Sequence, residues 1–75
     1  MITYNVQIKV QGIKLKSKIK KLDKFNIGVT NDFSLNSTIA LAARLLELEY
    51  KEVHRAELIL TSQINKNDTK RVVLK

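Results

Sequence analysis

The chain has 75 residues, with 14 lysines and arginines against 7 aspartates and glutamates, and its formal net charge is +7 at pH 7. A chain of this length forms one domain with a small core, which buries only about 60% of the surface that the unfolded chain exposes. The absence of cysteine excludes disulfides and thiolate metal sites and is typical of a reducing compartment. We therefore expect residues 1–75 to be a single cytoplasmic domain.

Neither a signal peptide nor a membrane-spanning segment is predicted. The N-terminal MITYNVQIKV has no cationic start and no continuous apolar stretch. The longest apolar run, IALAA at residues 39–43, is far shorter than the roughly 18 residues that a spanning helix needs. A soluble protein with no membrane partner is expected.

Charge is distributed unevenly along the chain. Residues 1–31 carry seven lysines against one aspartate, residues 32–63 have a net charge of −2, and residues 64–75 have a net charge of +3. An anionic partner is therefore expected to meet the two ends of the chain.

The first predicted element is a half-buried strand at residues 2–10. Its sequence, ITYNVQIKV, alternates between apolar and polar side chains, which is typical of a strand with one face in the core. Gln11 and Gly12 follow as a predicted two-residue hairpin loop, in which the glycine supplies a positive φ.

The next stretch, IKLKSKIK at residues 13–20, has a lysine at every second position. A hairpin around Gly12 would place Ile13 opposite Val10 and Leu15 opposite Ile8, with the apolar side chains on one face. A helix here would have only about ten residues, which is marginal in water. We favour a strand; the helical alternative would make this a basic amphipathic segment suited to a membrane surface.

The rest of the chain predicts one more strand, a helix and a closing hairpin. Residues 24–30 alternate as a strand, and residues 35 to about 51 are rich in helix formers, with Ser34 or Asp32 as the cap. Residues 55–64 and 69–75 are interpreted as a hairpin around NKND, although an apolar stripe would also allow the helix to continue to about residue 60. The predicted fold is α+β, a small antiparallel or mixed sheet in the order β-β-β-α-β-β with one helix packed on one face.

The sequence offers little support for catalysis. It has one histidine and no glycine-rich phosphate loop, and the carboxylates Glu47 and Glu49 are explained by solubility. His54 with Glu52 and Glu57 would be a weak metal site, and a surface histidine is more common. We expect a non-enzymatic protein without cofactor or metal.

Lysines dominate the outward face of the predicted hairpin, where Lys9 would lie opposite Lys14. Lysine neutralises phosphate, and neighbouring amide side chains can bond to a nucleic-acid backbone or to base edges. No aromatic ring is predicted on this face, so we expect duplex nucleic acid, held through its phosphates, rather than stacked single strands. The alternative is that the lysines only prevent association of sheet edges. The predicted nucleic-acid-binding residues are Lys9, Lys14, Lys16, Lys18 and Lys20.

The predicted helix has more apolar surface than one sheet can cover. Leu41, Leu45 and Leu48 form a second stripe, separate from the one that would face the sheet. This stripe is a predicted oligomer interface, most simply of a two-fold homodimer. The rival hypothesis for function is a protein–protein interaction module, an inhibitor or assembly subunit, that uses this stripe or a sheet edge.

Overall fold

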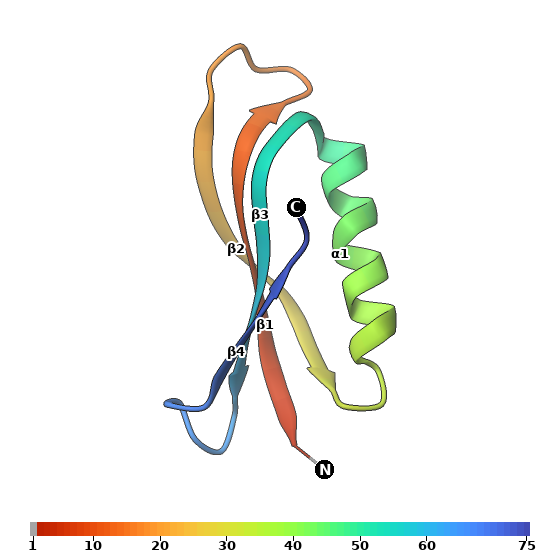
Figure 1. The fold of residues 1–75 in the computed structure, drawn as a ribbon, viewed down its shortest axis with the longest axis vertical. Coiled ribbons are helices and arrows are strands. Elements are labelled where there is room, and N and C mark those ends of the chain that lie inside the picture. The colour runs from red at the N-terminus through yellow and green to blue at the C-terminus, as the bar shows by residue number, and fades with distance from the viewer. Residues whose placement is uncertain (1) are drawn as a thin grey trace.

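The computed structural model describes residues 2–75 and contains four strands and one helix in that range (Figure 1). The strands form one antiparallel sheet in the order β2-β1-β3-β4, and the helix packs on one face of it. The predicted α+β class is therefore confirmed. The elements are β1 (Thr3–Lys14), β2 (Lys21–Asn31), α1 (Leu35–Glu49), β3 (Tyr50–Ser62) and β4 (Thr69–Val73).

The core lies between α1 and the two central strands. The alternation predicted for the first strand is confirmed, because its apolar residues from Tyr4 to Val10 point to the helix and are at most 2% exposed. Each aliphatic side chain buried in this way contributes about 1.5–3 kcal/mol. The buried core residues are Tyr4, Val6, Ile8 and Val10 from β1, Ala42 and Leu46 from α1, and Tyr50, Ala56, Leu58 and Leu60 from β3.

The predicted hairpin loop at Gln11 and Gly12 is wrong, because β1 continues through both residues to Lys14. Gly12 pairs with β3 at a shift in register that follows Gln11. A Cβ atom on Gly12 would collide with the carbonyl oxygen of Glu52. This glycine therefore permits the close approach of two strands and does not make a turn.

Since the turn lies elsewhere, the predicted strand at residues 13–19 is also wrong beyond Lys14. Residues 15–20 connect β1 to β2, and the hairpin pairs Ile8 with Phe25 rather than with Leu15. The predicted strand at 24–30 falls within β2, where Phe25 and Ile27 pack against the core. Phe25 and Ile27 take the place on the core that the sequence assigned to the apolar side chains of residues 13–19. The order in the described residues is β-β-α-β-β, one strand fewer than predicted.

The helix and the closing hairpin agree with the sequence. α1 ends at Glu49 and β3 begins at the next residue, so the alternative of a helix reaching residue 60 is wrong. Ser34 occupies the N-cap position, but its side chain makes no capping bond. Instead the Asn31 side-chain oxygen accepts bonds from the amides of Phe33 and Ser34, at 2.9 and 3.0 Å.

One hydrogen bond links the start of β3 to the edge strand β2. The Tyr50 hydroxyl donates to a carboxylate oxygen of Asp23 at 2.7 Å. Burial, and then this bond, raise the pKa of Tyr50 well above its usual value. The bond closes the end of the core from which the β1–β2 connection projects.

Candidate functional site

The face of the sheet opposite α1, here called the open face, is predominantly polar. Strand register places residues of all four strands on it, and none of them is aromatic. On it, the cations Lys9, Lys24, Arg55 and Arg71 outnumber the carboxylates Glu52 and Glu57. The side chains of the open face include Asn5, Gln7, Lys9, Gln11, Ile13, Leu22, Lys24, Asn26, Val29, Glu52, Arg55, Glu57, Ile59, Thr61, Thr69, Arg71 and Val73.

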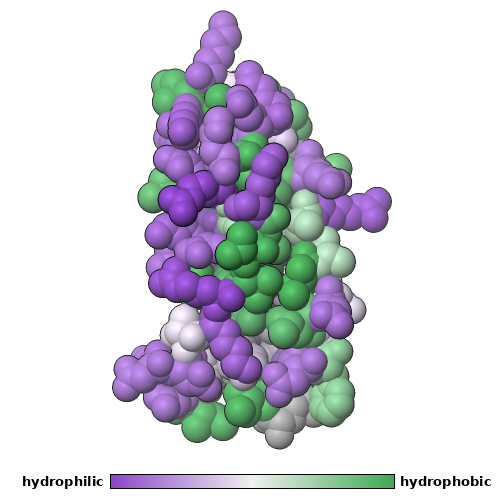
Figure 2. Space-filling model, in the orientation of Figure 1, coloured by the Kyte–Doolittle hydropathy of each residue, from purple (hydrophilic) through white to green (hydrophobic). Residues whose placement is uncertain are grey.

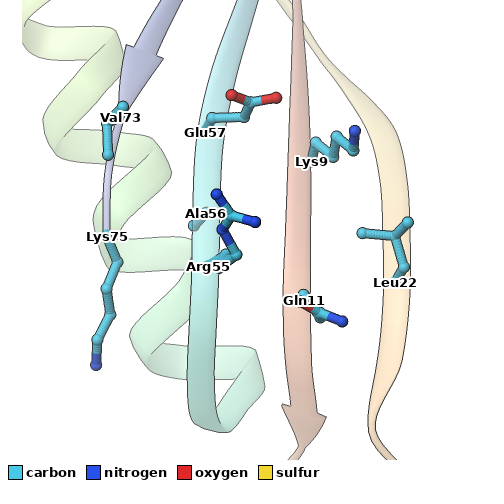
Figure 3. Close-up of a pocket in the computed structure, with 8 residues that line it drawn as sticks. All are labelled: Lys9, Gln11, Leu22, Arg55, Ala56, Glu57, Val73 and Lys75. Atoms are coloured by element: carbon cyan, nitrogen blue, oxygen red, sulfur yellow. The ribbon is translucent and has the colours of Figure 1, made fainter.

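A hollow of about 330 Å³ crosses one half of the open face, with α1 behind the sheet (Figure 3). Its one carboxylate, on Glu57, accepts a bond from the Arg71 guanidinium at 2.6 Å. That ion pair neutralises Glu57, so the charge of the hollow comes from three cations. The hollow is lined by Lys9, Gln11, Leu22, Arg55, Ala56, Glu57, Val73 and Lys75.

The other half of the open face is lined by amides. A shallow hollow of about 690 Å³ lies there, and the Gln63 amide donates to the Asn5 side-chain oxygen at 3.1 Å. Amide groups both donate and accept, so this half can bond to polar ligands of either kind. The lining residues are Asn5, Gln7, Asn26, Gly28, Val29, Thr61, Ser62, Gln63 and Lys66.

The densest charge lies at residues 14–21, which are the β1–β2 connection and the strand residue on each side of it, here called the lysine tip. Its sequence KLKSKIKK contains five lysines and no acidic residue, and all five are exposed. The connection stands at one end of the molecule, beyond the C-terminal end of α1 (Figure 1). The Lys14 ammonium lies 6.0 Å from the centre of the Tyr50 ring, at the outer limit of a cation–π contact.

The structure divides the five predicted lysines between these two regions. Lys14, Lys16, Lys18 and Lys20 come together on the lysine tip, joined by Lys21, which was not among the predicted residues. Lys21 directly follows Lys20, and this position in the sequence could have included it in the predicted set.

Lys9 lies apart from the tip, on the open face. It pairs with Lys24 on one side and with Glu57 on the other, so the predicted pairing with Lys14 is wrong. The like-charge pair with Lys24 costs a few tenths of a kcal/mol, which the neighbouring Glu57 offsets. Arg55, at the same hollow, was not predicted either, although the alternation along β3 would have placed it outward with Glu57.

The predicted leucine stripe is largely uncovered. Leu41 and Leu48 are 55% and 64% exposed and Leu45 is half-buried, whereas Ala42 and Leu46 carry the contact with the sheet. Figure 2 shows hydrophobic side chains gathered between the helix and the C-terminal strand, with hydrophilic ones around them. That these leucines form an interface stays a prediction.

Other chemistry has less support in the described residues. Across residues 2–75, no group of three or more histidine, cysteine, aspartate or glutamate side chains is placed to hold a metal. His54 lies 3.6 Å from Glu52, and Glu57 is already bonded to Arg71. The helix of that same range is too short and too polar to cross a membrane.

Comparison with known proteins identifies no relative. No protein-family model, no curated protein and no solved structure matches the chain. The charge, register and exposure of the residues described above therefore carry any functional conclusion.

Proposed function

We propose that the chain is a non-enzymatic accessory protein that binds duplex nucleic acid through the lysine tip and the adjoining cations of the open face. The observation that carries this proposal is the density of charge on the tip, five exposed lysines within eight residues and no carboxylate among them. The nearest acidic residue along the chain, Asp23, accepts the hydroxyl bond of Tyr50.

The shape of the region supports a duplex as the ligand. B-form DNA carries one negative charge per roughly 1.7 Å of its axis, and each phosphate that a lysine neutralises releases condensed counterions. The lysine tip is the end of the hairpin that β1 and β2 form, so its lysines stand together at one end of the molecule, where a duplex can approach them. The charge continues from the tip along the open face through Lys24, Lys9 and Arg55.

The positions of the aromatic residues favour a duplex over a single strand. Tyr4 and Tyr50 are buried and Phe25 packs against the core, so these rings are not offered to unpaired bases. Phe33 is 85% exposed, but it precedes α1, at the opposite end of the helix from the tip. Proteins that hold single strands stack successive bases on exposed rings.

The test is binding of a fluorescently labelled duplex, followed by anisotropy at a series of salt concentrations. Four or five neutralised phosphates predict a slope of log K against log salt near −4, at about −0.9 for each phosphate. Binding should therefore weaken by a factor of roughly 150–500 between 50 and 200 mM salt. Absence of binding to any DNA or RNA duplex at 50 mM salt would contradict the proposal.

We also infer that the leucine stripe packs against a second copy of the chain. The exposure of Leu41 and Leu48 is the observation that supports a protein–protein function. The helix is the least basic region of a chain with a charge of +7, because Arg44 is its one cation against Glu47 and Glu49. Two copies can therefore approach at α1 with less repulsion than elsewhere. In an antiparallel two-fold pair, Arg44 of one copy would come near Glu47 of the other.

Light scattering tests this inference directly. A dimer should have twice the chain mass of 8.6 kDa, and Leu41→Ser with Leu48→Ser should reduce it to the mass of one chain. A monomer at about 100 μM in the wild type would contradict self-association at the concentrations where such an interface is relevant. The leucines would then be available to a different protein, as the rival hypothesis holds.

A further inference from the structure

The lysine tip exposes aliphatic side chains as well as charge. Leu15 is 55% exposed and Ile19 is 69% exposed, and Leu22, just beyond the tip, is 62% exposed. A segment that served only for solubility or for contact with phosphates would have no use for these side chains in water. Exposed hydrophobic residues that cluster on one loop mark a contact surface.

Hydrogen bonds hold this loop in a defined conformation. The Leu15 amide donates to the Glu49 carbonyl oxygen at 3.1 Å, which ties the start of the loop to the end of α1. The Ser17 amide donates to the Lys14 carbonyl oxygen at 3.0 Å, and the Ser17 hydroxyl oxygen accepts a bond from the Ile19 amide at 3.2 Å. The two apolar side chains are therefore presented on an ordered backbone, which lowers the entropy lost on binding.

The order of residues along the tip alternates charge with apolar surface. Leu15 lies between Lys14 and Lys16, and Ile19 lies between Lys18 and Lys20. In the minor groove of a duplex, two rows of phosphates flank a floor of base-pair edges. Apolar side chains that enter this groove can separate two base pairs while neighbouring cations bind the phosphates, and the duplex then bends away from the protein.

We propose that the lysine tip inserts Leu15 and Ile19 between base pairs from the minor groove and bends the duplex. This inference rests on the proposed binding of duplex nucleic acid and adds its mode: the lysines supply attraction and the two aliphatic side chains supply the deformation. Sequence preference would then come from base steps that unstack easily, since the minor groove offers a degenerate pattern of donors and acceptors.

An anionic membrane surface also attracts lysines and accepts aliphatic side chains. One observation favours the duplex. The cations Lys9, Lys24 and Arg55 and the amides of the open face extend the charged surface away from the tip, along the sheet. A flat bilayer touched by the tip would leave these residues unused, whereas a duplex that extends from the tip along the sheet would reach them.

The experiment uses a duplex of about 30 base pairs with a fluorescence donor and acceptor at its two ends, with binding followed separately by anisotropy. The wild type should raise energy transfer at saturation, because a wedge of this kind bends DNA by roughly 20–90°. Leu15→Ser with Ile19→Ser should still bind with the wild-type salt slope, since every lysine remains, but should leave energy transfer at the level of the free duplex.

The matched control is Phe33→Ser with Ile64→Ser, which also removes two exposed apolar side chains, 85% and 83% exposed, but away from the tip. This control should bend the duplex as the wild type does. All three proteins should give the same far-ultraviolet circular dichroism, because none of the four side chains lies in the core.

The outcomes separate the inference from the function on which it rests. Binding without a change in energy transfer, or equal bending by the tip variant, overturns insertion and leaves the proposed function standing. No binding by the wild type overturns both. Binding to vesicles of anionic lipid that the tip variant loses, with no bending of the duplex by the wild type, replaces insertion into DNA with insertion into a membrane.

Discussion

The two faces of β1 differ in what their side chains do, although they alternate residue by residue along the same strand. Toward α1, Ile8 is fully buried between the helix and the neighbouring strands. Away from α1, the next residue, Lys9, faces water among cations and amides. Ile8 therefore contributes to packing, whereas its neighbour Lys9 contributes to the charge of the open face. Stability and binding should be separable by substitutions one position apart.

The largest expected effect is on the covered face. Ile8→Ala removes a fully buried side chain and leaves a cavity, which should lower the free energy of unfolding by about 2–5 kcal/mol. In a domain of this size, 1 kcal/mol corresponds to about 4–8 °C in Tm. Urea denaturation followed by circular dichroism measures the change, and Lys9→Ala is the matched control, expected to stay within about 0.5 kcal/mol.

Substitution of Gly12 should have the next largest effect on stability. It distinguishes a glycine in a turn from a glycine at a close contact between strands. In a hairpin turn with positive φ, Gly12→Asn would be tolerated, because asparagine adopts that conformation. Here any Cβ meets the Glu52 carbonyl oxygen, so asparagine and alanine should both destabilise the protein, by about 1–3 kcal/mol. Gln11→Asn is the control, and a Tm for Gly12→Asn equal to that of the wild type would contradict the observed register.

This glycine also shows how far the sequence could predict the fold. The alternation in β1 and the helix-forming composition of residues 35–49 predicted a buried strand and α1, because both signals are local. A glycine at position 12 is compatible with a turn and with a close contact between strands. The sequence alone does not reveal that the Glu52 backbone approaches it. Because Gly12 was assigned to a turn, residues 13–19 were predicted to be a strand.

The candidate site was predictable to the same degree. Four of the five predicted lysines meet on the lysine tip, because residues close in sequence stay close in any loop. Lys9 is separated from them, and its neighbours Lys24 and Glu57 are set by pairing between strands that lie far apart in the chain. The sequence does not reveal the pairing between distant strands, so the neighbours of Lys9 could not be predicted from it.

A smaller effect is expected from the hydrogen bond between Tyr50 and Asp23. Tyr50→Phe should lower the free energy of unfolding by about 1 kcal/mol, the usual worth of such a bond. Because the folded state raises the pKa of the Tyr50 hydroxyl above its usual 10.0, its contribution is complete below pH 10 and is lost as the pH rises further, when the unfolded chain ionises first.

Chemical denaturation at pH 8 and at pH 11 measures this dependence. The wild type should lose more stability between the two values than Tyr50→Phe does. An equal loss in both proteins would show that Tyr50 does not couple folding to ionisation.

The most direct test of the proposed function is the salt dependence of duplex binding when charge is removed from the lysine tip alone. Lys16→Gln with Lys18→Gln should reduce the magnitude of the slope of log K against log salt by about two, at about 0.9 for each phosphate that is no longer neutralised, without changing the Tm. Lys51→Gln with Lys70→Gln makes the same change in net charge at two lysines that lie outside the tip and line neither hollow of the open face, and it should leave the slope near its wild-type value. Equal slopes for the wild type and the tip variant would contradict the claim that the lysine tip binds phosphates.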